Sequence, residues 1–235
     1  MSGLRVLVAC EFSATVRDAF RARGFDAWSC DLLPTEGDPR WHIQGDALPW
    51  LDDPANRWDL LIAHPPCNHL AASGAQYWPL KKADGRQQAA INFFLGLMKA
   101  PVRHIAVENP VGIMGSVFRK ADQIVQPWQF GDPYNKKTCL WLRNLPKLVP
   151  TKIVTPTHNW GTNSYRSGSR KKSVLPSLKW GSQDRAKSFP GIAAAMAEQW
   201  GNHLQPLDNR SGSEPYARQS AAGVGASFHA SELAQ

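Results

Sequence analysis

The first strand–helix–strand unit of this chain, "LRVLVACEFSATVRDAFRARGFDAWSCD" at residues 4–31, sets its fold. Residues 4–9 form a continuous apolar run, which is typical of a parallel strand covered on both faces. Residues 14–24 carry apolar side chains on one helical face and close on a glycine, a residue that favours helix C-termini. Residues 26–31 are a second short strand that ends in Asp31. Two strands joined through a helix by short connections predict a parallel pair.

The alternation of strands and helices continues along the chain and predicts an α/β domain over residues 1–145. Further strands are predicted at residues 41–46, 58–63 and 103–109, a helix at 85–100, and a possible pair of strands at 124–130 and 137–142. We therefore expect an open, mostly parallel, Rossmann-like sheet with helices on both faces.

The rest of the chain differs in composition. Residues 146–187 are rich in Pro, Ser, Thr, Gly, Trp and basic residues and show little periodicity, which indicates a loop-rich insertion. A helix of strong helix formers follows within residues 188–205. Gly, Ser and Ala dominate residues 206–235, and this composition predicts a disordered tail.

Length and hydrophobicity suggest one sizeable domain. The chain has 235 residues, of which 43% are hydrophobic, so it can bury a substantial core. No apolar run approaches the roughly 18 residues of a membrane span, and the N-terminus "MSGLRVLVACEF" lacks a signal-peptide layout. We expect a cytoplasmic protein, monomeric and without a membrane partner.

Positive charge is concentrated in one part of the sequence. The formal net charge is +8, and the stretch between Asn135 and Gln183 holds ten Lys and Arg residues but no Asp or Glu. An ordinary solvated surface mixes both signs, so this asymmetry favours a polyanionic partner such as nucleic acid. The alternative is a basic face that serves solubility only.

The four cysteines are expected to be reduced, and none suggests a metal. Cys10, Cys30 and Cys139 lie in apolar, strand-like stretches, where a thiol is usually a small buried hydrophobe. No Cys or His cluster has the spacing of a zinc site, so no metal is predicted. Cys67 differs because it follows a predicted strand end and two prolines.

Chemically useful side chains follow the predicted strands. In an open α/β sheet, ligands bind at the carboxyl ends of the strands. The residues expected there are Glu11, Phe12 and Ser13 after the first strand, Asp31 after the second, Asp46 after the third, Pro65, Pro66 and Cys67 after the fourth, and Glu108, Asn109 and Pro110 after the fifth. These residues should converge on one edge of the sheet. Asp31 and Asp46 have a plainer alternative as turn residues, because Asp favours turns.

Cys67 and Glu108 suggest covalent catalysis. Two prolines restrict the backbone that presents the thiol, which is a candidate nucleophile at a ligand-binding edge. The neighbouring strand end supplies a carboxyl group that can move a proton. A thiol and a carboxyl group on adjacent strand ends form a pair suited to nucleophilic chemistry.

These motifs together resemble those of the DNA cytosine-C5 methyltransferases, in the short form found in phages and mobile elements. The similar motifs, in the family's order over roughly residues 4–204, are "CDLLP" at 30–34, "GD" at 45–46, "PPC" at 65–67, "ENP" at 108–110, "GDPYNKKTCLWL" at 131–142 and "QWGN" at 199–202. The resemblance implies a class I S-adenosylmethionine-dependent methyltransferase fold. It also implies a bacterial or phage-infected host cell.

The resemblance assigns roles to residues of this chain. Cys67 would be the nucleophile and Glu108 the group that assists at N3 of cytosine. S-Adenosyl-L-methionine would be bound by Phe12, Ser13, Asp31, Asp46, Pro65 and Asn202. DNA would be contacted by Lys136, Lys137 and Thr138 and, in a target-recognition insertion at 146–187, by Arg166, Arg170, Lys171 and Lys172. Residues 188–205 would complete the catalytic domain at 1–145.

The chain departs from the family's pattern in three places. The family's first motif is glycine-rich, whereas "EFSATVRD" at 11–18 contains no glycine. Asn68 stands where the family usually has Gln. The arginines of the motif that supports the cytosine are replaced by Lys136 and Thr138, and lysine cannot make the same bidentate contact.

In the mechanism that the resemblance implies, the Cys67 thiolate adds to C6 of cytosine, which activates C5 to take the methyl group. The base must leave the duplex stack, at a cost of a few kcal/mol, unless the substrate is single-stranded.

Two other functions stay open. One is an amino-methyltransferase acting on adenine N6 or cytosine N4, although its motif has an aromatic residue where this chain has Cys67. The other is a non-catalytic nucleic-acid-binding relic of the fold.

Overall fold

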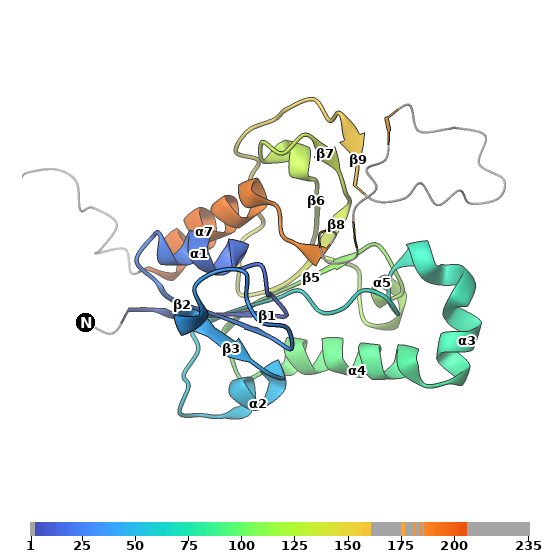
Figure 1. Ribbon diagram of the computed structural model, residues 1–235, viewed down its shortest axis with the longest axis horizontal. Coiled ribbons are helices and arrows are strands. Elements are labelled where there is room, and N and C mark those ends of the chain that lie inside the picture. Colours follow the sequence, from blue (N-terminus) through green and yellow to red (C-terminus); the bar gives the residue numbers. More distant parts are fainter. Residues whose placement is uncertain (1–2, 161–174, 177–180, 182–183, 185, 206–235) are drawn as a thin grey trace, which may run out of the picture. The chain divides into compact units, whose positions relative to one another are not determined.

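The computed structural model describes residues 3–160, 175–176, 181, 184 and 186–205 (Figure 1). The tail predicted at 206–235 lies outside these residues, as does much of the basic insertion.

A seven-stranded sheet is the centre of the fold, with strand order β3-β2-β1-β4-β5-β8-β6. Strands β3, β2, β1, β4 and β5 run parallel, whereas β8 runs antiparallel to both β5 and β6. The strands are β1 (Arg5–Ala9), β2 (Asp26–Asp31), β3 (His42–Gln44), β4 (Leu60–Ala63), β5 (His104–Pro110), β6 (Gln123–Val125) and β8 (Thr138–Arg143). A separate two-stranded parallel sheet pairs β7 (Tyr134–Asn135) with β9 (His158–Asn159).

Helices cover both faces of the large sheet (Figure 1). The helices whose bounds are described are α1 (Thr15–Arg21), α2 (Ala47–Asp52), α3 (Trp78–Ala83), α4 (Arg86–Lys99), α5 (Met114–Val117) and α7 (Pro190–Leu204). Short 3-10 helices occur at Pro39–Trp41, Ala72–Tyr77 and Pro127–Gln129. None of the helices in the described part of the chain has the length and apolar character that a membrane span requires.

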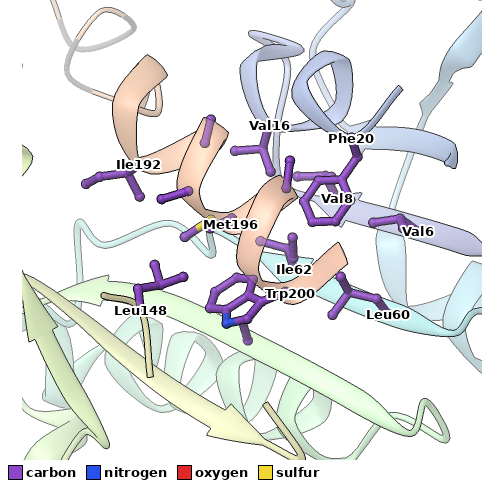
Figure 2. Close-up of a cluster of buried hydrophobic side chains, with 14 of the residues drawn as sticks. Val6, Val8, Val16, Phe20, Leu60, Ile62, Leu148, Ile192, Met196 and Trp200 are labelled. Atoms are coloured by element: carbon purple, nitrogen blue, oxygen red, sulfur yellow. The ribbon is translucent and has the colours of Figure 1, made fainter. Parts of the chain in front are cut away.

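One face of the sheet is covered by α1 and α7, as Figure 2 shows. Phe20 from α1 and Met196 and Trp200 from α7 pack there on Val8 and Ile62 of the two central strands. Trp200 is fully buried, and its indole N–H donates to the carbonyl of Pro146 at 2.9 Å. Removal of a buried tryptophan usually costs about 3–5 kcal/mol, so this side chain holds α7 firmly on the sheet.

The opposite face is covered by α2 and α4. Leu51 of α2 and Phe94 and Leu97 of α4 pack against Leu7 and Leu61. Successive strand residues point to opposite faces, and in β1 both sets are buried. This two-sided burial is why the central strands are continuous apolar runs in the sequence. The predicted Rossmann-like fold, with a mostly parallel sheet and helices on both faces, is confirmed.

The predicted pair of strands after residue 123 forms in shortened form. Ile124 of β6 lies opposite Cys139 of β8, as expected. The prediction that the first of these strands reaches residue 130 is wrong, because the chain turns into a 3-10 helix at Pro127. Proline has no backbone N–H to donate to the neighbouring strand, so β6 ends before it.

Candidate active site

The carboxyl ends of the five parallel strands lie at one edge of the sheet. Ala9 at the end of β1 is paired with Cys30 on one side and with Ala63 on the other. Ala63 is paired in turn with Val107 of β5. The strand order reverses its direction between β1 and β4, and open α/β sheets bind ligands at such a reversal.

The turn after β1 is built without glycine yet uses backbone conformations that favour it. Cys10 and Ala14 have φ of 58° and 62°, a region that costs a non-glycine residue of order 1–3 kcal/mol. The carboxylate of the buried Glu11 holds this turn, because it accepts from the backbone N–H groups of Val16 at 2.7 Å and Arg17 at 3.1 Å. Burial raises the pKa of Glu11, although nearby His64 and these hydrogen bonds act in the opposite direction.

The residues predicted to hold a cofactor at the ends of β1, β2 and β3 form what we call the acidic half of the site: Phe12, Ser13, Asp31 and Asp46. Burial raises the pKa of Cys30 to about 12, and the negative charges of Asp31 and Asp46 contribute to this shift. The same two charges act on Cys10, whose pKa burial also raises. Asp31 and Asp46 are therefore close neighbours of both thiols, and neither thiol is activated.

Each acid also caps local backbone. Asp31 accepts from the N–H of Leu33 at 2.9 Å, and Asp46 is the N-cap of α2, accepting from the N–H of Leu48 at 3.1 Å. The carbonyl of Phe12 accepts from the Thr35 hydroxyl at 3.0 Å and so ties the loop after β2 to this edge. Both aspartates thus have the local turn or capping role that was the alternative prediction for them.

The loops after β4 and β5 are docked on each other. The Asn109 side chain donates to the carbonyl of Pro65 at 2.9 Å, and the N–H of Ile113 donates to the carbonyl of Leu70 at 2.9 Å. A Cβ atom on Gly112 would lie only 2.1 Å from that Leu70 oxygen, so only glycine permits this approach. The backbone that carries "PPC" is thereby held beside the backbone that carries "ENP".

Cys67 lies within this docked loop. Its carbonyl accepts from the N–H groups of Leu70 at 3.0 Å and Ala71 at 2.9 Å, which closes a tight turn, and its side chain is half-buried. Pro65, two residues earlier, is buried.

Glu108 and His64 form a side-chain pair at the ends of β5 and β4. Nδ1 of His64 lies 3.4 Å from Oε2 of Glu108. Oε1 of Glu108 and Nε2 of His64 are buried and have no hydrogen-bond partner among the described residues. Burial alone would raise the pKa of Glu108, but the hydrogen bond from His64 and the positive charge of Lys136 outweigh it and lower this pKa.

A small cavity adjoins this pair. It has a volume of about 30 Å³, and its polar lining is supplied by His64, Glu108, Lys136, Thr138, Lys187 and Ser188. Ala186, Phe189 and the first turns of α7 complete the lining with Val16 of α1. This volume is close to that of one water molecule. Cys67 is not among the described residues that line it.

Two of the predicted DNA-contacting residues lie at this cavity. The Lys136 ammonium is 5.4 Å from the centre of the Phe189 ring, and Thr138 is buried at the start of β8. Lys137, between them, is exposed. The other predicted DNA contacts, Arg166, Arg170, Lys171 and Lys172, lie outside the described residues.

Asn202 is not brought to this edge, which corrects its predicted role in cofactor binding. Its side-chain oxygen accepts from Arg23, which follows α1, at 2.9 Å. The next residue, His203, packs its ring against that of His104 at the start of β5, with ring centres 5.9 Å apart. Asn202 is therefore at the amino edge of the sheet, whereas the first turn of α7 is at the cavity.

His64 was not among the site residues predicted from the sequence. The signal that could have revealed it is its position directly before "PPC", at the end of a parallel strand. No group of three or more His, Cys, Asp or Glu residues in the described ranges could hold a metal ion.

A scan against protein-family models finds no match for the chain, and a search of curated proteins finds none either. Among solved structures, the chain is similar to a prophage-encoded E. coli protein described as a DNA modification methyltransferase, with 17% identity and a TM-score of 0.43 over 65% of this chain and 52% of that one. It is also similar to the Entamoeba histolytica methyltransferase EhMeth, with 14% identity and a TM-score of 0.46 over 66% of this chain and 58% of that one. This chain thus spans little more than half the length of each of the two similar proteins.

Proposed function

We propose that this protein is an S-adenosylmethionine-dependent methyltransferase that modifies carbon 5 of cytosine in DNA. The observation that carries the proposal is the largely buried carboxylate of Glu108 in β5, which lines a cavity. The neighbouring strand β4 leads into Pro65-Pro66-Cys67. The end of β5 and the loop after it are held against the cysteine loop through Asn109 and Gly112. A nucleophile and a proton-transferring carboxyl group on adjacent loops are what addition to a pyrimidine ring requires.

The acidic half suits the proposed methyl donor. S-Adenosylmethionine carries a sulfonium cation, ribose hydroxyls and an adenine amine, and all of these interact favourably with carboxylates. Asp31 and Asp46 each use one oxygen for a backbone N–H. Either can use its second oxygen for a ligand, and the buried Phe12 offers an apolar surface beside them. When bound, the donor supplies an electrophilic methyl group.

The residues of this chain would then carry out the addition and proton-transfer steps on the cytosine base. The Cys67 thiolate adds to C6, and the ring's electron pair moves onto the N3 side as N3 receives a proton through Glu108. Carbon 5 thereby becomes nucleophilic and accepts the methyl group. Loss of the C5 proton and departure of the Cys67 sulfur restore the aromatic ring. Lys136 and Thr138, which line the same cavity, would bind polar atoms of the base or its phosphate.

Entry of the base requires a movement at the cavity. A cytosine ring is much larger than the present volume of about 30 Å³. Beside Phe189, the Lys187 ammonium forms ion pairs with Glu36 at 2.9 Å and with Asp184 at 3.2 Å. These ion pairs must break, and the ring of Phe189 must move, before a base can enter. Exposed ion pairs of this kind are weak, at about 0–1 kcal/mol each. Binding of DNA by the basic segment could readily offset that cost.

The decisive experiment is covalent trapping on DNA that contains 5-fluorocytosine. Fluorine cannot leave as the C5 proton does, so the wild-type protein should form a donor-dependent adduct that survives denaturation. Cys67→Ser should abolish adduct and turnover, because a serine hydroxyl lacks the nucleophilicity of a thiolate at neutral pH. Cys139→Ala, at a buried thiol in β8, is the matched control and should still trap.

Product analysis separates the alternatives. Mass spectrometry of digested DNA should find the methyl group on carbon 5 of cytosine. Methylation at N4 of cytosine or N6 of adenine, with Cys67→Ser still active, would mean amino-group chemistry. DNA binding without cofactor binding in calorimetry would point to a non-catalytic relic of the fold.

A further inference from the structure

His64 is a polar residue of the site to which the proposed mechanism gives no role. It is the first residue after β4, and its side chain is only 10% exposed. Its ring lines the cavity together with Glu108. Nδ1 faces the Glu108 carboxylate at 3.4 Å, while Nε2 is buried without a hydrogen-bond partner in the described part of the chain. Buried polar atoms in proteins are normally hydrogen-bonded, so the buried Nε2 without a partner suggests a functional role for this side chain.

The charged groups around this ring come from every neighbouring element. Glu108 is on β5, and Glu11, which follows β1, is close enough for His64 to lower its pKa. Lys136, just before β8, and Lys187, just before α7, line the same cavity. The imidazole thus lies among two carboxylates and two ammonium groups.

The chemistry of the base requires such a proton. Glu108 has a lowered pKa, so it is ionised at neutral pH and has no proton of its own to give. A cytosine that receives a thiolate at C6 needs a proton at N3. An imidazole can both take up and release a proton, and His64 is in contact with the carboxylate that would face N3.

We propose that His64 is a positioning residue that stores the proton which Glu108 delivers to N3 of the target cytosine. This role rests on the function proposed above. As the S–C6 bond forms, one proton moves from Nδ1 of His64 to Oε2 of Glu108, and the carboxyl group protonates N3. When the S–C6 bond breaks, N3 returns the proton to the carboxylate and the imidazole takes it back. The pair is unchanged over one cycle, and the C5 proton leaves separately.

The first test asks whether the two side chains share a proton, and it does not depend on activity. Nitrogen-15 NMR of the wild-type protein should show a slowly exchanging proton on Nδ1 of one imidazole. That signal should be absent from His64→Asn, which assigns it, and from Glu108→Gln, which removes the anion. A signal that persists unchanged in Glu108→Gln would show that His64 and Glu108 do not share a proton.

The second test measures the rate of the chemical step in a single turnover. His64→Asn can still donate a hydrogen bond but cannot store a proton, so the rate should fall by about 100-fold, the lower end of what proton-transferring groups usually contribute. Wild type and His64→Asn should also differ in the shape of their pH–rate profiles, because only the wild type can store a proton at this position. Affinities for donor and DNA should change less than about two-fold, because the role is confined to the chemical step.

A matched variant and a double variant sharpen the result. His69→Asn changes the other histidine of the same loop, which does not line the cavity, and should keep both the rate and the pH profile. In a Glu108→Gln background, His64→Asn should cause no further loss, because the two residues act as one unit. Additive losses, or full activity of His64→Asn, would overturn the proposal. A wild-type protein that shows the NMR signal but transfers no methyl group to carbon 5 would overturn the proposed function instead.

Discussion

At the residue scale, the two aspartates of the acidic half have a structural task beside the ligand-binding task proposed for them. Asp46 caps α2 through one oxygen, and its charge also acts on the thiols at the ends of β1 and β2. Asp31 does the same for the turn after β2. A carboxylate has about four acceptor sites, so one capping bond does not exhaust it. A substitution that keeps the cap but removes the charge can therefore separate the two tasks.

Asp46→Asn is that substitution, because Asn caps helices about as well as Asp. The affinity for S-adenosylmethionine should weaken by about 1.5–3 kcal/mol, the scale of a hydrogen bond to a charged group, while thermal unfolding stays nearly unchanged. Calorimetry and a melting curve measure the two quantities. Asp53→Asn is the control, since Asp53 caps Ala55 in the same way beyond the end of α2. Equal affinity in both variants would remove Asp46 from the proposed cofactor site.

At the element scale, the site depends on close approach between backbones. Gly112 lies against the Leu70 carbonyl, which docks the loop after β5 on the loop after β4. Gly191 shows the same feature at the start of α7, where a Cβ atom would lie 1.9 Å from the Phe130 carbonyl oxygen. Its N–H donates to Asp132 at 2.9 Å. Backbone atoms cannot move aside as side chains can, so these two glycines determine how closely the elements around the cavity approach.

Gly112→Ala should push the two loops apart. We expect a loss of about 1–3 kcal/mol in the free energy of unfolding, as for other overpacked sites. A larger fractional loss of methyl-transfer rate should accompany it, since the shift would move the loop that carries Cys67 away from the end of β5, where Glu108 lies. Gly115→Ala is the matched control, because no atom lies within 4 Å of its added Cβ. Denaturant unfolding and activity of both variants check this, and equal behaviour would show that the close approach at Gly112 does not hold the site.

At the scale of the whole molecule, charge is distributed unevenly. The net charge is +8, yet the side of the carboxyl edge proposed to bind the cofactor carries Asp31 and Asp46. The segment that contains ten basic residues and no acidic ones begins at Lys136, beside the cavity, and continues through the insertion. A cationic donor and a polyanionic substrate would thus each meet a region of opposite charge.

Neutralising Arg170, Lys171 and Lys172 together should weaken DNA binding and flatten its salt dependence. The log–log slope on duplex DNA should fall by about 0.9 for each phosphate group that the protein no longer binds. Arg23, Lys99 and Arg103 provide a control triple with the same change in charge at the amino edge of the sheet. Their replacement should leave the slope nearly unchanged. Binding titrations at several salt concentrations measure both triples, and equal slopes would mean that only net charge matters.

Local pattern was sufficient to predict the strands and long helices of the sheet. The apolar run at residues 4–9 contains β1, and the periodic stretch at 85–100 contains α4. Burial on both faces leaves an unbroken apolar signature, and a long amphipathic helix leaves a 3.6-residue period. The short helices α2, α3 and α5 were missed, because one or two turns carry too little periodicity to be recognised. The convergence of strand ends at one edge also followed, since parallel topology requires it.

Only the tertiary structure could pair His64 with Glu108 or separate Asn202 from the cavity. The histidine and the glutamate are 44 positions apart, and their pairing depends on the register of β4 against β5. Asn202 belongs to a motif that resembles a cofactor-closing helix, but α7 has 15 residues and is therefore about 22 Å long. Its first turn lies at the cavity, so its last turn must lie at the opposite edge. Sequence determines which elements form because their signals are local, whereas distances between side chains are set by packing across the sheet.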